Sequence, residues 1–460
     1  MSEPHIVIIG GGFSGAAVAV HLLRDAQTSL RITVIEPREV PGLGVAYSAA
    51  DPAHRINVPA ARMQLSGEDE GAFERWYRQQ ESYRRDTDAR RPDGSVYPQR
   101  GEFGRYVAEA FFTAAQKQLG RVMHLRDTAI AWQDNQVITA QGKRIFADRV
   151  VLAVSHPPPD LPKEVRAIAG HPRLIANPWV AGALENIPLD ANVAIAGTAL
   201  SMADVVASLS RLGHRGTLLA FSRHGLLSRA NAAAGLPKWQ ADYSTGTLRQ
   251  RLRQIREDIA RAAVSGLPWQ VVLDEVRSQG QSIWQQLSER EQRQFLRHLR
   301  RFWDVHRYRI APQVADAIAS REQAGLLTVL AARLKTVTAK ENHLRLQLAV
   351  RGDALRDLNV DYLILTTGPA HATLTESQPF LRDLRAQGLI RPDVLGLGID
   401  VDARSQTLNA QGEPSTTFLV SGPAARGRFG ELMGLPQVAD HAQAVARELL
   451  LTLSARCPAV

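Results

Sequence analysis

Near its beginning the chain reads His5-Ile6-Val7-Ile8-Ile9-Gly10-Gly11-Gly12-Phe13-Ser14-Gly15. An apolar, β-branched run leads directly into a glycine turn, and the small and apolar residues 16–23 that follow predict a helix. A second apolar run over residues 32–35 ends in the acid Glu36. This order predicts a β-α-β unit with Gly10-x-Gly12-x-x-Gly15 at its first turn.

Each position of this motif suits a bound dinucleotide. Gly10 would permit the sharp turn, Gly12 would let the backbone approach a pyrophosphate, and Gly15 would let helix and strand pack closely. The helix N-terminus would present free N–H groups and a partial positive charge to the phosphates. Glu36 would accept hydrogen bonds from a ribose, and its charge argues against a 2′-phosphate there. The unit therefore predicts FAD or NAD binding.

The composition is that of a globular protein with room for two or three domains, at 460 residues and 45% hydrophobic content. No apolar run approaches the roughly 18 residues of a membrane span. The first strand leaves no room for a signal peptide, so we expect a cytoplasmic protein. The net charge of +9 would suit an anionic partner, but no nucleic-acid-binding module is recognisable, so we do not expect nucleic acid as a partner.

Cysteine content narrows the chemistry. Cys457 is the only cysteine, so an intrachain disulfide, a CxxC redox pair and a multi-thiolate metal site are excluded. A disulfide-reductase mechanism, which needs two thiols beside a flavin, is excluded with them. No spacing of histidine and glutamate predicts a metal site.

The segments after the first unit add three candidates. Gly44 lies in a glycine-rich and proline-rich loop of the kind that lines a ligand crevice. Asn57 could hydrogen-bond a flavin and is then a candidate catalytic residue, or it could satisfy loop backbone groups. Arg100, at the start of a predicted helix, could pair with a cofactor phosphate or a substrate anion, or it could be a surface charge.

A second unit begins with a buried strand over residues 193–196 and the turn Gly197-Thr198-Ala199-Leu200-Ser201. Its fingerprint is degraded, because Ala199 stands at the second glycine position. The following strand ends in Ser222-Arg223, where the first unit has an acid. A hydroxyl and a guanidinium suit a 2′-phosphate. The second unit therefore predicts NADP(H), with NAD(H) as the alternative.

These units predict an α/β fold of two Rossmann-like dinucleotide-binding domains, one for FAD and one for NAD(P). We assign residues 1–190 and 366–460 to the FAD domain and residues 191–365 to the NAD(P) domain. The latter includes a helical insertion at about 247–323. Within the insertion, Arg307 could hold an anionic substrate and is a candidate catalytic residue. Gly422 begins a glycine-rich loop before the last helix.

Several motifs run in order over nearly the whole chain and resemble bacterial FAD/NAD(P)-binding proteins known as uncharacterised NAD(FAD)-dependent dehydrogenases. That family is more distantly similar to flavin N-hydroxylating monooxygenases. The resemblance implies FAD at the first turn, NAD(P)H at the second and no particular substrate. Ser155 departs from the pattern, since such flavoproteins usually have glycine there, and Ala199 departs likewise. The motifs are residues 10–15, Gly44-x-Ala46-Tyr47, Asn57-Val58-Pro59, Arg100-x-x-x-Gly104-x-Tyr106, residues 197–204, Ser222-Arg223-His224-Gly225 and Trp303-Asp304-x-His306-Arg307.

The function expected from the sequence is an FAD-dependent oxidoreductase that uses NAD(P)H. We expect a monooxygenase that oxygenates a small nucleophilic substrate such as an amine. An NAD(P)H:acceptor reductase without oxygenation and a non-enzymatic nucleotide-binding regulator are the alternatives. The predicted cofactor-binding residues are Gly10, Gly12, Ser14, Gly15, Glu36, Gly44, Arg100, Gly197, Thr198, Leu200, Ser201, Ser222, Arg223 and Gly422.

Overall fold

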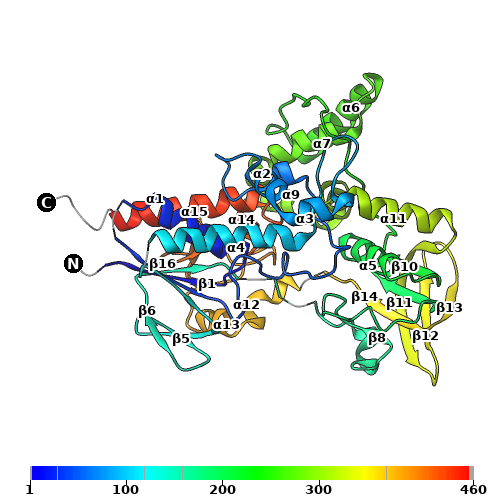
Figure 1. Ribbon diagram of the computed structural model, residues 1–460, viewed down its shortest axis with the longest axis horizontal. Helices are drawn as coiled ribbons and strands as arrows, with labels where there is room; N and C mark the ends of the chain where they lie inside the picture. The colour runs from blue at the N-terminus through cyan, green and yellow to red at the C-terminus, as the bar shows by residue number, and fades with distance from the viewer. Residues whose placement is uncertain are drawn as a thin grey trace.

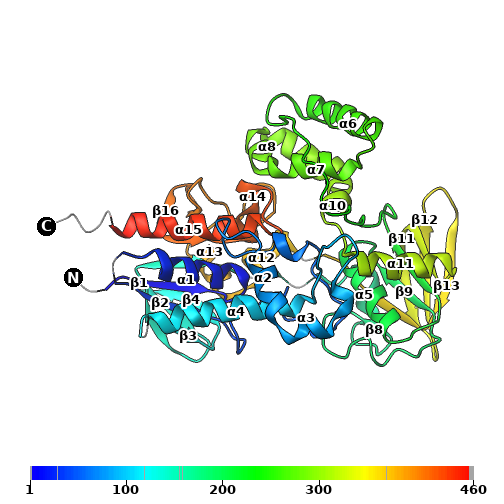
Figure 2. The same ribbon diagram turned by 45° about the horizontal axis from the view of Figure 1, so that its top comes forward.

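The computed structural model describes residues 3–454 apart from 28, 119, 155, 158 and 369. Ser155 and Cys457, both singled out above, lie outside the described residues. Two α/β halves lie side by side along the long axis of the molecule, and a group of helices projects above them (Figure 1). The turned view separates this helical group from both sheets (Figure 2). No helix within the described ranges combines the length and apolar character of a membrane span.

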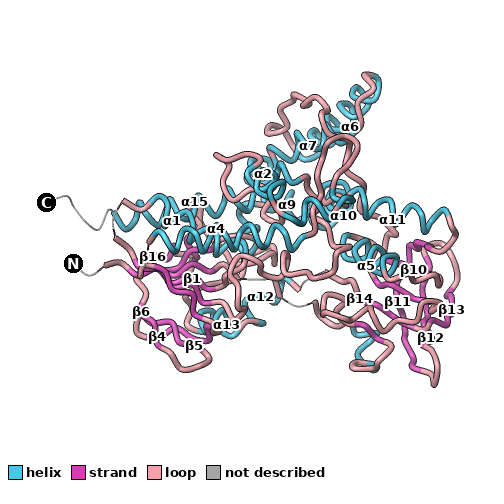
Figure 3. The backbone as a smooth tube through the Cα atoms, viewed as in Figure 1, coloured by secondary structure: helices cyan, strands magenta, loops and turns pink. Residues whose placement is uncertain are grey.

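The first half contains a sheet of six strands whose centre is the opening strand of the chain. Its strands other than β15 pair in parallel, and β1 is buried along its whole length, as expected for a strand covered on both faces. Helices α1 (Phe13–Asp25), α4 (Arg100–Lys117) and α15 (Gln437–Ser454) pack together along one face (Figure 3). In sheet order the strands are β15 (Gln406–Leu408), β16 (Pro414–Val420), β7 (Arg149–Leu152), β1 (His5–Ile9), β2 (Arg31–Ile35) and β3 (Val122–Leu125).

The second half contains a sheet of seven strands. Helix α5 (Leu200–Arg211) follows the second glycine turn of the chain, at Gly197, and packs on α11 (Pro312–Gln323). Strand β8 (Leu174–Ile175) pairs in parallel with β14. This sheet therefore includes residues that precede position 191, where we placed the start of the NAD(P) domain. The predicted fold class, with two Rossmann-like units, is confirmed. In sheet order the strands are β13 (Leu355–Val360), β12 (Leu344–Val350), β11 (Leu327–Ala339), β10 (Leu218–Ser222), β9 (Val193–Ala196), β14 (Tyr362–Leu365) and β8 (Leu174–Ile175).

The projecting helices lie within the predicted insertion, but the last helix of the predicted range, α11, packs instead on α5 of the second half. The first helix of the insertion, α6 (Leu248–Val264), begins at a capping box in which Thr247 and Gln250 satisfy each other's backbone N–H groups. The insertion continues through α7 (Trp269–Ser278), α8 (Gly280–Gln286), α9 (Glu289–Gln294), the π-helical turn Phe295–Leu299 and α10 (Arg300–Arg307). The smaller elements are α2 (Ala72–Gln79), α3 (Glu81–Arg85), β4 (Ala129–Gln133), β5 (Gln136–Thr139), β6 (Arg144–Phe146), α12 (Leu374–Ser377), α13 (Pro379–Ala386) and α14 (Arg426–Phe429).

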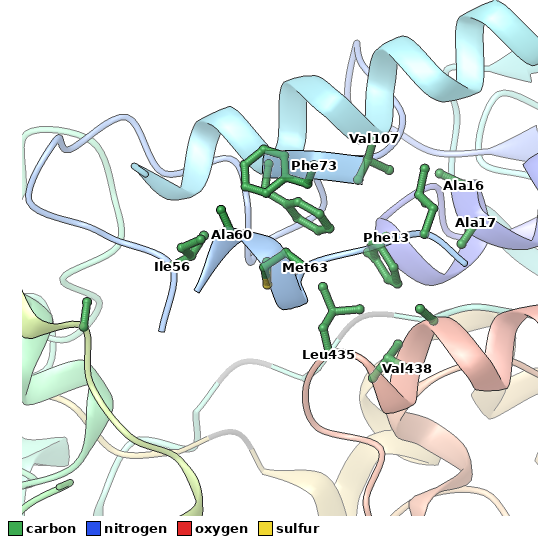
Figure 4. Packing of buried hydrophobic residues seen from close by; sticks show 14 of the residues in the cluster. Phe13, Ala16, Ala17, Ile56, Ala60, Met63, Phe73, Val107, Leu435 and Val438 are labelled. Carbon is green, nitrogen blue, oxygen red and sulfur yellow. The ribbon is translucent and has the colours of Figure 1, made fainter. Parts of the chain in front are cut away.

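The largest buried cluster surrounds the first glycine turn. Phe13 at the start of α1 packs with Phe73 of α2 and with Leu435 beside α15, although these residues are far apart in the sequence (Figure 4). Phe13 also stacks on Phe103, with ring centroids 5.7 Å apart. The core therefore fixes the N-terminus of α1 against the C-terminal loop of the chain. This arrangement brings the beginning and the end of the sequence to one site.

Candidate active site

Backbone geometry makes glycine necessary at two positions of the first turn. Gly10 has φ +98°, and a Cβ there would collide with the carbonyl oxygen of Ala153. A Cβ on Gly15 would collide with the carbonyl oxygen of Gly10. Gly12 has an ordinary φ of −69°, but Gly44 lies against it, and a Cβ on Gly44 would come within 3.0 Å of the Gly12 Cα. The loop at Gly44 therefore lies directly on the turn.

The acid after β2 lies at the same turn. Glu36 is 3% exposed, and its Oε2 accepts a hydrogen bond of 2.9 Å from the Gly11 backbone N–H. Its Oε1 accepts from the backbone N–H and from Nη1 of Arg38, both at 3.0 Å. A carboxylate has about four acceptor positions, so lone pairs remain for ribose hydroxyls.

A cavity of about 160 Å³ lies in front of this turn and includes several predicted residues. Gly10, Gly12, Ser14, Glu36 and Gly44 line it. Its opposite wall is formed by Met433, Gly434, Leu435 and Val438, at the start of α15. A cradle that Cβ atoms would fill, a helix N-terminus and a buried acid fit the pyrophosphate and ribose of FAD.

Gly422 supports this cavity from its edge. It has φ +91°, and a Cβ there would collide with Oγ of Ser14. Its N–H donates to Nδ1 of His441 at 3.0 Å. Gly422 therefore fixes how closely the final strand and loop approach helix α1.

The second turn uses glycine more sparingly. Gly197 has φ +131°, and its N–H donates to the Phe221 carbonyl at 2.8 Å. Ala199 has φ −99°, which any residue adopts, so alanine costs this turn no backbone strain. Thr198 donates from Oγ1 to the Leu226 carbonyl at 2.6 Å, and its Oγ1 lies 2.8 Å from the Ser222 hydroxyl. The hydroxyl groups of Thr198 and Ser222 therefore form hydrogen bonds with other groups of the protein.

Positive charge gathers at the end of β10. Arg223 is exposed, and the pKa of the adjacent His224 is lowered first by partial burial and then by four arginine side chains. Arg223 is the only one of these that the sequence motif indicated. The others come from distant segments of the chain, so no local pattern announces them. The four arginines are Arg223, Arg301, Arg333 and Arg351.

A larger cavity, of about 400 Å³, lies between the second turn, the insertion and the C-terminal loop. We call it the central cavity. Ala199, Leu200 and Ser201 of the second turn line one part of it, and helices α6, α7, α8 and α10 with the π-helical turn line another. Met433 lines both the central cavity and the cavity at the first turn, so the two adjoin there. Of the predicted residues, the central cavity therefore includes Leu200 and Ser201.

Three other predicted residues line neither of these cavities and form polar contacts with other parts of the protein. Arg307 is 7% exposed and donates from Nε to Glu431 at 2.9 Å. Arg100 forms an ion pair of 2.9 Å with Asp204 of α5 and lies over the Trp179 ring. The Asn57 backbone carbonyl accepts from the Asn231 side chain at 3.0 Å. In this arrangement Arg307 and Arg100 join different parts of the chain, and their proposed contacts with ligands stay predictions.

Two histidines that sequence reasoning did not select lie where the cavities meet. His156 lines the first cavity and His371 the central cavity, and their ring centroids are 5.0 Å apart. Burial, aided by the charge of Arg426, lowers the pKa of His156 to about 4 and that of His371 to about 3. Both rings are therefore neutral near pH 7. His156 follows β7, which Asp148 precedes, and His371 follows β14, which Asp361 precedes; this repeated pattern of an acid and an apolar strand could have indicated both.

The sequence of the first half is similar to a known family. Residues 7–157 match the model of a family described as FAD-NAD(P)-binding. No curated protein matches the sequence at a significant level. The family match covers the first glycine turn, Glu36 and the Gly44 loop.

Solved structures match over nearly the whole chain. The ornithine hydroxylase of Pseudomonas aeruginosa, in its reduced form, aligns with TM-score 0.66 at 14% identity, over 98% of this chain and 100% of that one. The ornithine N-hydroxylase of Kutzneria sp. 744, with reduced FAD, NADP+ and L-ornithine, aligns with TM-score 0.65 at 15% identity, over 99% and 100%. The L-lysine 6-monooxygenase of Pseudomonas syringae aligns with TM-score 0.61 at 17% identity, over 99% of each. The expected resemblance is thus confirmed: the chain has the fold of these enzymes, with an FAD-NAD(P)-binding domain over residues 7–157.

Proposed function

We propose that this protein is an FAD-dependent oxidoreductase of monooxygenase type that oxidises NADPH. One observation carries the proposal: the cavity at the first turn and the central cavity adjoin at Met433, and the central cavity also reaches the second turn at Ala199, Leu200 and Ser201. A flavin, a nicotinamide and a substrate would therefore meet in one enclosed space. Neither a nucleotide-binding regulator nor a simple scaffold requires that convergence.

The residues at the first turn would bind and orient FAD. The α1 N-terminus would hold the pyrophosphate, and Glu36 would hold the ribose. FAD, when bound, supplies hydride acceptance and the activation of O2. Leu435 and Val438 line the same cavity, so the N-terminus of α15 would favour negative charge on the flavin ring.

The second turn would bind NADPH. Gly197 and the N-terminus of α5 would hold the pyrophosphate, and the four arginines around His224 would bind the 2′-phosphate. The substrate would then occupy the rest of the central cavity. Since the structural relatives are an ornithine hydroxylase, an ornithine N-hydroxylase and a lysine monooxygenase, we propose oxygenation of a small nucleophile, an amine among them.

The absorption spectrum of the purified protein is the first test. We expect a flavin band, and we expect NADPH oxidation to exceed NADH oxidation once FAD is loaded. Assays with a panel of amines should yield an oxygenated product in proportion to the NADPH consumed. Absence of FAD binding would refute the proposal, and electron transfer to a quinone with no oxygenated product would identify an acceptor reductase instead.

A further inference from the structure

The central cavity has an apolar wall on its insertion side. This wall comes from α6, α8 and the π-helical turn, and it is largely aliphatic and aromatic. Burying such surface against a ligand stabilises the complex by about 25 cal/mol per Å². A short, fully charged molecule would gain little from this wall. The apolar wall includes the side chains of Leu252, Ile255, Ile283, Trp284, Leu287 and Leu296.

Arg426 supplies a buried positive charge to the same cavity. It is 5% exposed and lies on α14, on the side of the cavity formed by the C-terminal loop. Its Nη1 donates to the thioether sulfur of Met433 at 2.9 Å, and thioethers are weak acceptors. Over the described ranges, no carboxylate forms an ion pair with Arg426. Burial lowers the pKa of Arg426 to about 10, so the side chain stays charged at neutral pH.

The carboxylates near Arg426 are already engaged by other groups. Asp393, which is buried, accepts from the backbone N–H groups of Leu395 and Leu397 at 2.9 and 2.6 Å. Glu431 accepts from Arg307 and from Trp303 Nε1, each at 2.9 Å. Asp304, which also lines the cavity, lies 3.4 Å from Arg300. An ammonium group entering here would compete with arginine for both acids. The least compensated charge of the cavity is therefore positive.

The contacts of the C-terminal loop show that this charge is held in place. Trp284 of α8 donates from Nε1 to the Gly427 carbonyl at 2.8 Å. Arg277 of α7 donates to the Leu435 carbonyl at 2.6 Å. The insertion therefore forms hydrogen bonds with the C-terminal loop on both sides of Met433. These bonds fix the position of Arg426 relative to the apolar wall.

We infer that the substrate of this site is an amphipathic anion, with an apolar body against the insertion and an acidic group on Arg426. A buried cation without a carboxylate partner is costly, and a ligand carboxylate would compensate it with charge-assisted hydrogen bonds. The inference deepens the proposed function by narrowing its substrate class, and it rests on that function only for the reaction. Binding itself can be measured without turnover.

Calorimetric titration of the FAD-loaded protein with octanoate, 1-octanol and octylamine tests the inference. We expect octanoate to bind about tenfold tighter than the alcohol or the amine, because only octanoate pairs with Arg426. In Arg426→Met, octanoate affinity should fall to that of octanol while octanol binding is unchanged. In Ile283→Asn, binding of both should weaken.

Arg293→Met is the matched control, because Arg293 is an exposed residue of α9 paired with Glu289 outside the cavity. It should bind octanoate as the unmodified protein does. Octylamine binding as tight as octanoate, unchanged octanoate affinity in Arg426→Met, or no binding of any probe would overturn the inference. Loss of FAD from a folded Arg426→Met protein would overturn it too, by assigning Arg426 to the cofactor. NADPH oxidation is measured separately, so a protein that binds octanoate without redox activity would refute only the proposed function.

Discussion

The two glycine turns share a topology and differ in how tightly they are enclosed. In the first, Gly10 and Gly15 occupy positions where a Cβ would collide with backbone, and Gly44 lies against Gly12. In the second, Ala199 has an ordinary conformation and Met202 is buried at the third motif position. The second turn also has close neighbours, because Thr198 donates to the Leu226 carbonyl at 2.6 Å and a Cβ on Gly197 would collide with Thr366. Ala199, however, lines the central cavity.

This difference bears on how each dinucleotide would be held. A turn enclosed by a loop and by the start of α15 suits a cofactor that stays bound between turnovers. A turn that faces a cavity of about 400 Å³ suits one that must enter and leave with each turnover. The proposed roles of FAD and NADPH follow this division, and four substitutions test it.

The largest effect is expected at Gly10. Gly10→Ala places a Cβ against the Ala153 carbonyl at φ +98°, which should lower the free energy of unfolding by about 3 kcal/mol and abolish flavin binding. Urea denaturation and flavin absorbance measure the two effects. A protein that keeps both its flavin and its stability would show that the first turn is not rigid.

Glu36 comes next. Glu36→Gln removes the charge that accepts from Arg38 and from the Gly11 N–H, and it weakens ribose binding. The dissociation constant for FAD should rise by a factor of about 10 to 100, equivalent to about 1.4 to 3 kcal/mol. Titration of the apoprotein with FAD measures this dissociation constant. The affinity of the same variant for NADPH should not change.

Arg223 should separate the two nicotinamide cofactors. Arg223→Ala removes an exposed guanidinium from the arginine group around His224 and should raise KM for NADPH about tenfold while KM for NADH stays constant. Steady-state NADPH and NADH oxidation would show this. Arg215→Ala, at an exposed arginine paired with Asp190, is the matched control and should leave both values unchanged.

The smallest effect is expected at Ala199. Ala199→Gly restores a motif glycine where φ is −99°, so it relieves no strain and should destabilise the protein by at most about 1 kcal/mol. KM for NADPH should change less than about twofold. A large improvement in KM would mean that the Ala199 methyl group obstructs the cofactor.

Most of the fold and both glycine turns could be predicted from local sequence patterns. The strand, glycine turn, helix and acid of residues 5–36 are contiguous, so each could be predicted from its neighbours, and the structure places Glu36 at Gly11 as the motif requires. The second unit was predictable for the same reason despite Ala199. Strand β14 of this unit pairs in parallel with β9.

The central cavity could not be predicted in the same way. Arg426, Met433 and His371 come together with α6 and α10 through contacts between distant segments, and a sequence pattern does not encode such distances. Arg307 was selected as a candidate anion-binding residue, yet its partner Glu431 lies 124 residues away. Long-range pairing of this kind explains why the site residues were harder to foresee than the fold.

The Arg100–Asp204 pair has a consequence for motion. It joins helix α4 on the first sheet to helix α5 on the second, with both side chains nearly enclosed. Removing one partner of a buried ion pair while the other stays buried costs about 3 to 5 kcal/mol. Arg211 and Asp51 form a second link, at 2.9 Å, between the same two halves. A catalytic cycle that swung one half away from the other would have to break both links at every turnover, whereas a cycle in which only the nicotinamide and the substrate move would leave them intact.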